Sequence, residues 1–113
     1  MLFVSGSNGS QHKLNITYDV FEFFTQRYKI KGNVEIHYTD LSHDFALGFT
    51  EKNGDEHFVQ VHHDLIESEM ILTIFHELTH VIQNEQGIYF DKLREDQAYH
   101  MENVLYDWWC DSR

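Results

Sequence analysis

An amphipathic segment over residues 66–86 constrains this chain more than any other feature. Its apolar residues recur at the spacing of one helical face: Ile71, Ile74, Phe75, Leu78, Val81 and Ile82. Asp64 and Glu67 have capping-box-like spacing near its start, and Gly87 is a natural C-cap at its end. The segment therefore predicts a long helix that buries one side against a core.

Another face of this helix carries the run His76-Glu77-Leu78-Thr79-His80. Residues four apart lie on the same face of a helix, so both imidazoles can reach one cation. Zn²⁺ prefers nitrogen ligands in a tetrahedral shell. Glu77 follows the first histidine, where it can take a proton from a metal-bound water. A chain of this composition would contain the pattern by chance in roughly 6 of 100 cases. We therefore expect Zn²⁺ at His76 and His80, with Glu77 as the catalytic residue.

A catalytic zinc site usually has a third protein ligand, and Glu95 is the expected one. After His80 come the end of one helix, the turn at Gly87 and the start of another helix, which would return beside the motif. Ala98, one turn beyond Glu95, is small enough to let the two helices approach closely. Glu102 lies two turns beyond Glu95 on the same face. It is either a competing third ligand or an acceptor that orients a ligand imidazole.

The remaining pattern predicts an α+β fold with the order α-β-β-β-α-α and a three-stranded sheet. Asn53-Gly54 is a strong hairpin signal between two of the strands. Trp108 is expected on the apolar side of the last helix. Residues 1–13, which contain a Ser/Gly-rich run, are expected to form a flexible N-terminal segment. The expected elements are helices over 17–28, 66–86 and 92–109, and strands over 34–38, 45–50 and 56–62.

Length and charge limit the classes of function. With 113 residues the chain is expected to form a single domain, 1–113. Its formal net charge of −11 argues against nucleic-acid and anionic-membrane partners. No apolar stretch resembles a signal peptide or approaches the roughly 20 residues of a membrane span. Together with the single cysteine, Cys110, these features predict a cytoplasmic protein.

The motif run His76–Gln83, followed by Gly87, Glu95–Tyr99 and Glu102, resembles the small gluzincin-type zinc metallopeptidases of minimal zincin fold. Short bacterial and phage-encoded proteins belong to this group. The resemblance covers about residues 66–109, and it implies that Glu95 is the third zinc ligand. Many members carry Pro-Trp before that glutamate, whereas this chain has Leu93-Arg94, and the gluzincin segment N-E-x-x-S-D is absent.

The resemblance implies a zinc metalloendopeptidase whose substrate is a peptide or protein. It also implies that residues 45–50 form an edge strand that pairs with the substrate main chain. Tyr99, His100 and Tyr89 are candidate donors to the oxyanion, with Tyr99 preferred. One alternative is a catalytically idle or latent zinc-binding domain that acts as a protein-interaction module. Another is an acidic binding module with incidental histidines.

A further group of possible ligands, His62-His63-Asp64, follows the last expected strand. Adjacent residues at the end of a strand point to opposite faces of the sheet. We therefore expect that these histidines do not share a metal ion.

Overall fold

The computed structural model describes all 113 residues and has the α+β class expected from the sequence. The expected helix, three strands and two helices are present, and one further strand precedes them. In chain order the elements are β1 (Leu2–Ser5), α1 (Gln11–Thr25), β2 (Asn33–Thr39), β3 (Gly48–Asn53), β4 (Glu56–His62), α2 (Glu67–Gln86) and α3 (Asp91–Asp111), with a short 3-10 turn at Ser42–Asp44.

The sheet has four strands in the order β1-β2-β4-β3, so the expected three-stranded sheet is wrong. Strands β1, β2 and β4 are parallel, and β3 runs antiparallel to β4 at one edge. The additional strand, β1, is only four residues long and therefore too short to show a clear alternation. Its partner is distant in sequence, because Leu2 is paired with Val34.

The segment expected to be flexible, residues 1–13, holds β1 and the first turn of α1. Helix α1 begins at Gln11 and not near Thr17, because Ser10 caps it. The Ser10 hydroxyl oxygen accepts a hydrogen bond of 3.1 Å from the backbone N–H of Lys13.

A hairpin joins β3 and β4 as expected, but its two-residue loop is Gly54-Asp55, one residue later than the expected Asn53-Gly54. Residues Asn53 and Glu56 are paired, and Gly54 adopts φ +62°, which glycine tolerates without strain. Strand β3 starts later than expected, at Gly48. Phe45 takes a left-handed conformation with φ 51° at the end of the 3-10 turn, which interrupts extended backbone before Gly48.

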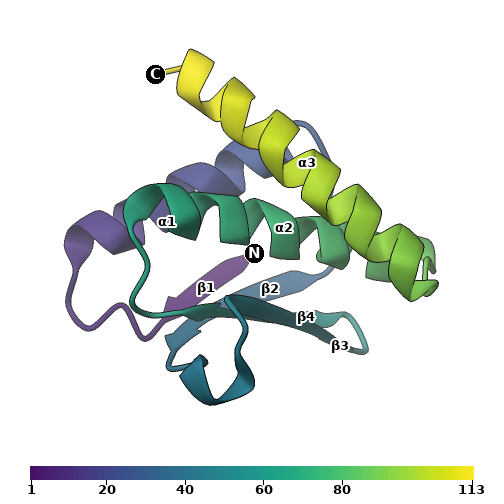
Figure 1. Cartoon of the computed structure of the whole chain (residues 1–113), viewed down its shortest axis with the longest axis horizontal. Coiled ribbons are helices and arrows are strands. Elements are labelled where there is room, and N and C mark those ends of the chain that lie inside the picture. The colour runs from purple at the N-terminus through teal and green to yellow at the C-terminus, as the bar shows by residue number, and fades with distance from the viewer.

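The molecule is layered, with helices over one face of the sheet (Figure 1). Helices α1 and α2 lie above the strands, and α3 crosses over α2 on the side away from the sheet (Figure 1). Side chains from β2, β4, α1 and α2 form most of one hydrophobic core of 17 buried residues. This packing fixes α2 between the sheet and α3, so its motif face lies close to both.

Two further expectations are wrong: the N-terminal capping box of α2 and the side of α3 that is buried. Helix α2 starts at Glu67 after an Ile66 N-cap that has no side-chain hydrogen bond, so the capping box is wrong, whereas Gly87 is the C-cap with φ 74°. In α3, Trp109 is buried with 6% exposure and Trp108 is 47% exposed, the reverse of the expected phase. Trp109 lies against Phe23, with 5.6 Å between ring centroids.

None of the helices combines the length and apolar character needed to cross a membrane.

Candidate metal centre

Helix α2 presents both motif histidines and Glu77 to one cleft. The His76 and His80 rings are 4.8 Å apart between centroids, and their Nε2 atoms are 3.2 Å apart. His80 is buried, with 6% exposure, and the His76 side chain is 12% exposed. The one-turn separation therefore places two ring nitrogens at one point, as the helical spacing predicts.

Helix α3 brings Glu95 to the same point. One carboxylate oxygen, Oε1, lies 2.7 Å from His80 Nε2, and Oε2 lies 3.6 Å from His76 Nε2. Ala98, one turn further along α3, is completely buried, which is consistent with the close packing of α3 on α2. The structure thus brings His76, His80 and Glu95 together, each with a ligand atom within 4.8 Å of the others.

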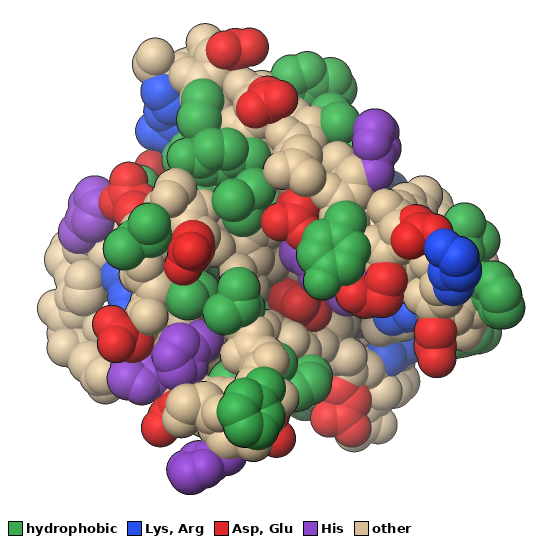
Figure 2. Space-filling view, viewed as in Figure 1, with side chains coloured by type: hydrophobic (Ala, Val, Ile, Leu, Met, Phe, Trp, Pro, Cys, Tyr) green, Lys and Arg blue, Asp and Glu red, His purple; other side chains and the backbone are tan.

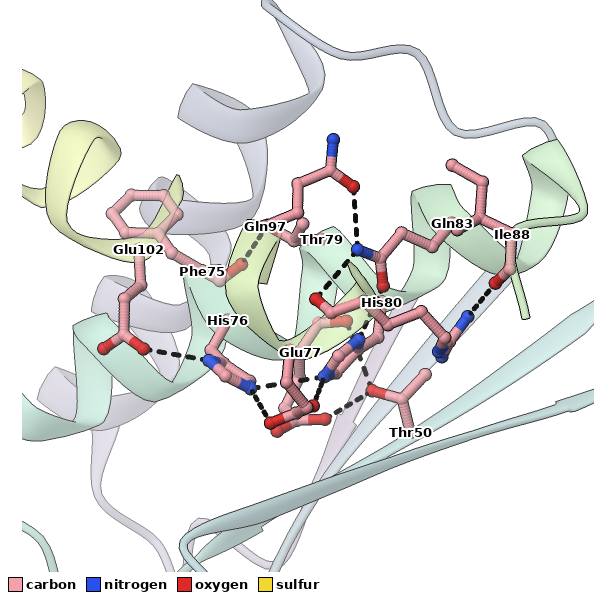
Figure 3. Close-up of polar contacts among 12 residues, drawn as sticks. Thr50, Phe75, His76, Glu77, Thr79, His80, Gln83, Ile88, Gln97 and Glu102 are labelled. Atoms are coloured by element: carbon pink, nitrogen blue, oxygen red, sulfur yellow. Dashed lines mark hydrogen bonds and ion pairs between the residues drawn. The ribbon is translucent and has the colours of Figure 1, made fainter. Parts of the chain in front are cut away.

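Glu102 contacts the outer side of His76 and does not join this group. Its Oε1 lies 2.9 Å from His76 Nδ1 (Figure 3). Glu95 lies near the other nitrogen of this ring, Nε2. Of the two roles that the sequence allows for Glu102, this geometry is that of an acceptor that orients a ligand imidazole. The Glu102 side chain is only 16% exposed, so solvent competes little with the contact.

The atoms of His76, His80 and Glu95 fit a zinc ion by chemistry and spacing. Two imidazole nitrogens and one carboxylate form a donor set found in catalytic zinc sites. Ligand atoms at about 2.1 Å from a tetrahedral ion lie about 3.4 Å from one another. The separations of 3.2 Å between the Nε2 atoms and 3.6 Å from His76 to Glu95 are close to this value, and the 2.7 Å contact is shorter.

Glu77 lies at the floor of the cleft between α2 and β3. The residue is 5% exposed, and its Oε1 accepts a 2.7 Å hydrogen bond from the Thr50 hydroxyl (Figure 3). Burial raises the pKa of Glu77, and the hydrogen bond from Thr50 and the nearby His80 and His76 offset part of that rise. Oε2 forms no hydrogen bond within the protein, so one oxygen is left for a substrate or a water.

Gly48 allows this approach of the helix to the edge strand. A Cβ atom at position 48 would lie 2.9 Å from Glu77 Cγ and 3.0 Å from Glu77 Oε2. Neither Gly48 nor Thr50 stands out in the sequence as a residue of the site. No local signal could have found them, because strand pairing and the packing of α2 decide which residues face Glu77.

The three possible ligands His76, His80 and Glu95, together called the metal group, face a cleft of about 530 Å³. On the surface, acidic and histidine side chains gather in a hollow between α3 and the sheet (Figure 2). One wall comes from β3 and the loop before it, where Phe45 is 97% exposed. The opposite wall comes from α3, including Arg94 and Tyr99. Apolar and charged groups thus face each other across the ligand atoms.

Of the three oxyanion-donor candidates, only Tyr99 lines the cleft. Its ring packs edge-on against His76, with 4.8 Å between centroids, and the residue is 59% exposed. Tyr89 and His100 are exposed and lie outside the cleft lining. Tyr99 is therefore the candidate that the fold keeps beside the metal group.

A second group combines Asp40 with the adjacent His62 and His63, so the expectation that these histidines point apart is wrong. Their rings are 5.0 Å apart, because His63 lies beyond the end of β4, where strand alternation stops. However, His62 Nδ1 already accepts a 3.0 Å hydrogen bond from the backbone N–H of Leu41. A neutral imidazole has a single acceptor nitrogen, so this ring holds the loop at Leu41 and has no lone pair left for a metal.

Comparison of the chain with protein-family models, with curated proteins and with solved structures finds no match.

Proposed function

We propose that this protein is a zinc-dependent metallopeptidase that hydrolyses peptide bonds with Glu77 as general base and general acid. One observation carries the proposal: His76, His80 and Glu95 converge in the same cleft as a buried carboxylate with one free oxygen. The resemblance of the motif to the gluzincin-type peptidases supports the choice of substrate.

In this proposal His76, His80 and Glu95 hold the ion. Bound zinc would supply a water of pKa near 7 and polarise the scissile carbonyl. Glu77 accepts the proton of the attacking water at Oε2, while the Thr50 hydroxyl donates a hydrogen bond to Oε1. Glu77 then donates that proton to the leaving amine. Tyr99, whose ring packs against His76, would donate to the developing oxyanion.

Strand β3 supports an extended peptide as the substrate. It is the edge of the sheet and pairs only with β4, so its outer backbone groups are free to pair with another chain. Gly48 and Thr50, which belong to this strand, are the same residues that contact Glu77. A substrate main chain on β3 would therefore pass beside the proposed catalytic carboxylate.

The test compares the wild-type protein with Glu77→Gln, loaded with zinc and incubated with a peptide library. We expect one zinc per chain in both proteins and hydrolysis by the wild type only, with at least a ~100-fold loss in Glu77→Gln. Glu69→Gln is the control, because Glu69 is exposed on the same helix outside the cleft. A protein that binds no zinc, or full activity in Glu77→Gln, would contradict the proposal.

The second candidate is a zinc-binding domain that does not turn over and serves protein interaction. The exposed Phe45 ring at the rim of the cleft favours it, because such a side chain suits contact with a partner. The fourth zinc position separates the two candidates. An exchangeable water there, detected by spectroscopy of the cobalt-substituted protein, fits a peptidase, and a protein ligand fits the idle domain.

A further inference from the structure

Gln83 links the two helices that carry the metal group. It is completely buried on α2, three residues after His80. Its Oε1 lies 2.7 Å from His80 Nδ1, and its Nε2 donates to the backbone oxygen of Arg94 at 3.0 Å and to Gln97 Oε1 at 2.8 Å. Figure 3 shows Gln83 between His80 and Gln97. One amide therefore touches one ligand directly and the residue next to another, Glu95.

The carbonyl of Arg94 decides which way this amide points. A backbone carbonyl oxygen can only accept a hydrogen bond, so the NH₂ group of Gln83 must face it. Oε1 of Gln83 must then face His80. Since a carbonyl oxygen only accepts, His80 Nδ1 must carry a proton. The lone pair of the neutral ring is thereby placed on Nε2, the nitrogen 2.7 Å from Glu95.

We propose that Gln83 is a positioning residue that fixes the metal-binding tautomer of His80 and couples it to the docking of α3. When α3 is in place, its Arg94 carbonyl orients the amide, and the amide orients the imidazole. The same contacts hold the turn of α3 that carries Glu95. The proposal rests on the metal site of the proposed function, but not on hydrolysis. The arrangement at His76 is different. There the partner is the carboxylate of Glu102, whose side chain makes no hydrogen bond to the backbone of α2 or α3.

The first test is nitrogen-15 NMR of the histidine rings in metal-free protein. We expect His80 Nδ1 to be protonated in the wild type, whether or not Nε2 also carries a proton. In Gln83→Met, which keeps the side-chain length but removes both amide functions, this preference should be lost. An unprotonated Nδ1 in the wild type would overturn the proposal, and this reading does not depend on metal or catalysis.

The second test measures zinc affinity by competition with a chelator. Gln83→Met should weaken zinc binding by about 10–100-fold, the usual effect of losing a partner behind a ligand. Gln83→Glu keeps the acceptor for His80 but cannot donate to Arg94, so its loss should be intermediate. Gln86→Met is the control, because Gln86 is exposed on the same helix and forms no side-chain hydrogen bond. Wild-type affinity in Gln83→Met would contradict the positioning role, whereas an absence of zinc binding in every protein would instead contradict the proposed function.

Discussion

The Thr50 hydroxyl donates a 2.7 Å hydrogen bond to Glu77 Oε1 and also lies 3.2 Å from the Glu77 backbone oxygen. One side chain of the edge strand thus contacts both the side chain and the backbone of the proposed catalytic residue. These contacts connect β3, where a substrate would pair, to the helix that carries the metal group. Changes in β3 should therefore alter the chemistry of Glu77 as well as substrate binding.

Thr50→Val should move the acidic limb of the pH–activity profile to higher pH. Burial raises the pKa of Glu77, and the hydrogen bond from Thr50 is the largest contribution that lowers it. Removing that bond raises the pKa further, so a higher pH is needed to ionise the carboxylate. The measurement is kcat/KM against pH for a peptide substrate. Thr50→Ser keeps the hydroxyl and should retain the wild-type profile, and an unchanged profile in Thr50→Val would argue against this role.

Gly48→Ala should reduce activity while leaving zinc bound. The added Cβ would lie within about 3 Å of the Glu77 side chain and of the Gln60 backbone oxygen, so Glu77 must move. We expect a loss of about 1–3 kcal/mol in the free energy of unfolding and a clear drop in kcat.

Gly54→Ala is the matched control for this variant, because its Cβ meets nothing within 4 Å but its φ of +62° strains the backbone. It should lose about 1 kcal/mol of stability and keep the activity of each folded molecule. Equal kcat losses in the two variants would show that stability, and not contact with Glu77, explains the effect.

The two glutamates of α3 should differ in their effect on zinc. Glu95→Gln removes a charged atom 2.7 Å from His80 Nε2 and should abolish stoichiometric binding at micromolar zinc. Glu102→Gln leaves the ligand group intact but weakens the partner of His76 Nδ1, so a loss of affinity of about 10–100-fold is expected. Zinc titration of both proteins gives the ranking. The reverse order would make Glu102 the third ligand.

Glu85 should stabilise the fold in a pH-dependent way. Burial alone would raise its pKa, but hydrogen bonds from the backbone N–H groups of Lys31 and Gly32 and from His57 outweigh it, so the pKa lies below the ordinary 4.5. Its ionised form is therefore favoured by folding, and the benefit is complete above pH 4.5 and is lost as the pH falls through the folded pKa.

At pH 7, Glu85→Gln should consequently have a free energy of unfolding about 1–3 kcal/mol below that of the wild type. Urea denaturation measures this difference. The difference from the wild type should shrink below pH 4.5. Glu51→Gln serves as control, because the Glu51 side chain is exposed on β3 and forms no hydrogen bond or ion pair. A difference that stays constant from pH 7 to pH 3 would contradict the assignment.

Local spacing accounts for the parts of the site that the sequence could predict. The i,i+4 separation of His76 and His80 is a property of any helix, and a short connection through Gly87 returns α3 beside α2. Glu95 therefore lies near the histidines for reasons visible in the chain. The helix phase of α3 was not visible, since Trp108 and Trp109 are equally apolar and only packing against Phe23 selects Trp109.

The sequence by itself determined the motif helix, its C-cap, the β3–β4 hairpin and the presence of a glutamate within reach of both histidines. Each depends on residues that are close together in the chain. Tertiary structure alone decided that Leu2–Ser5 forms a strand and that Thr50 and Gly48 face Glu77. It also decided that Glu102 contacts Nδ1 of His76. These relationships join segments distant in sequence, and strand pairing and helix packing, which fix them, leave no local pattern in the chain.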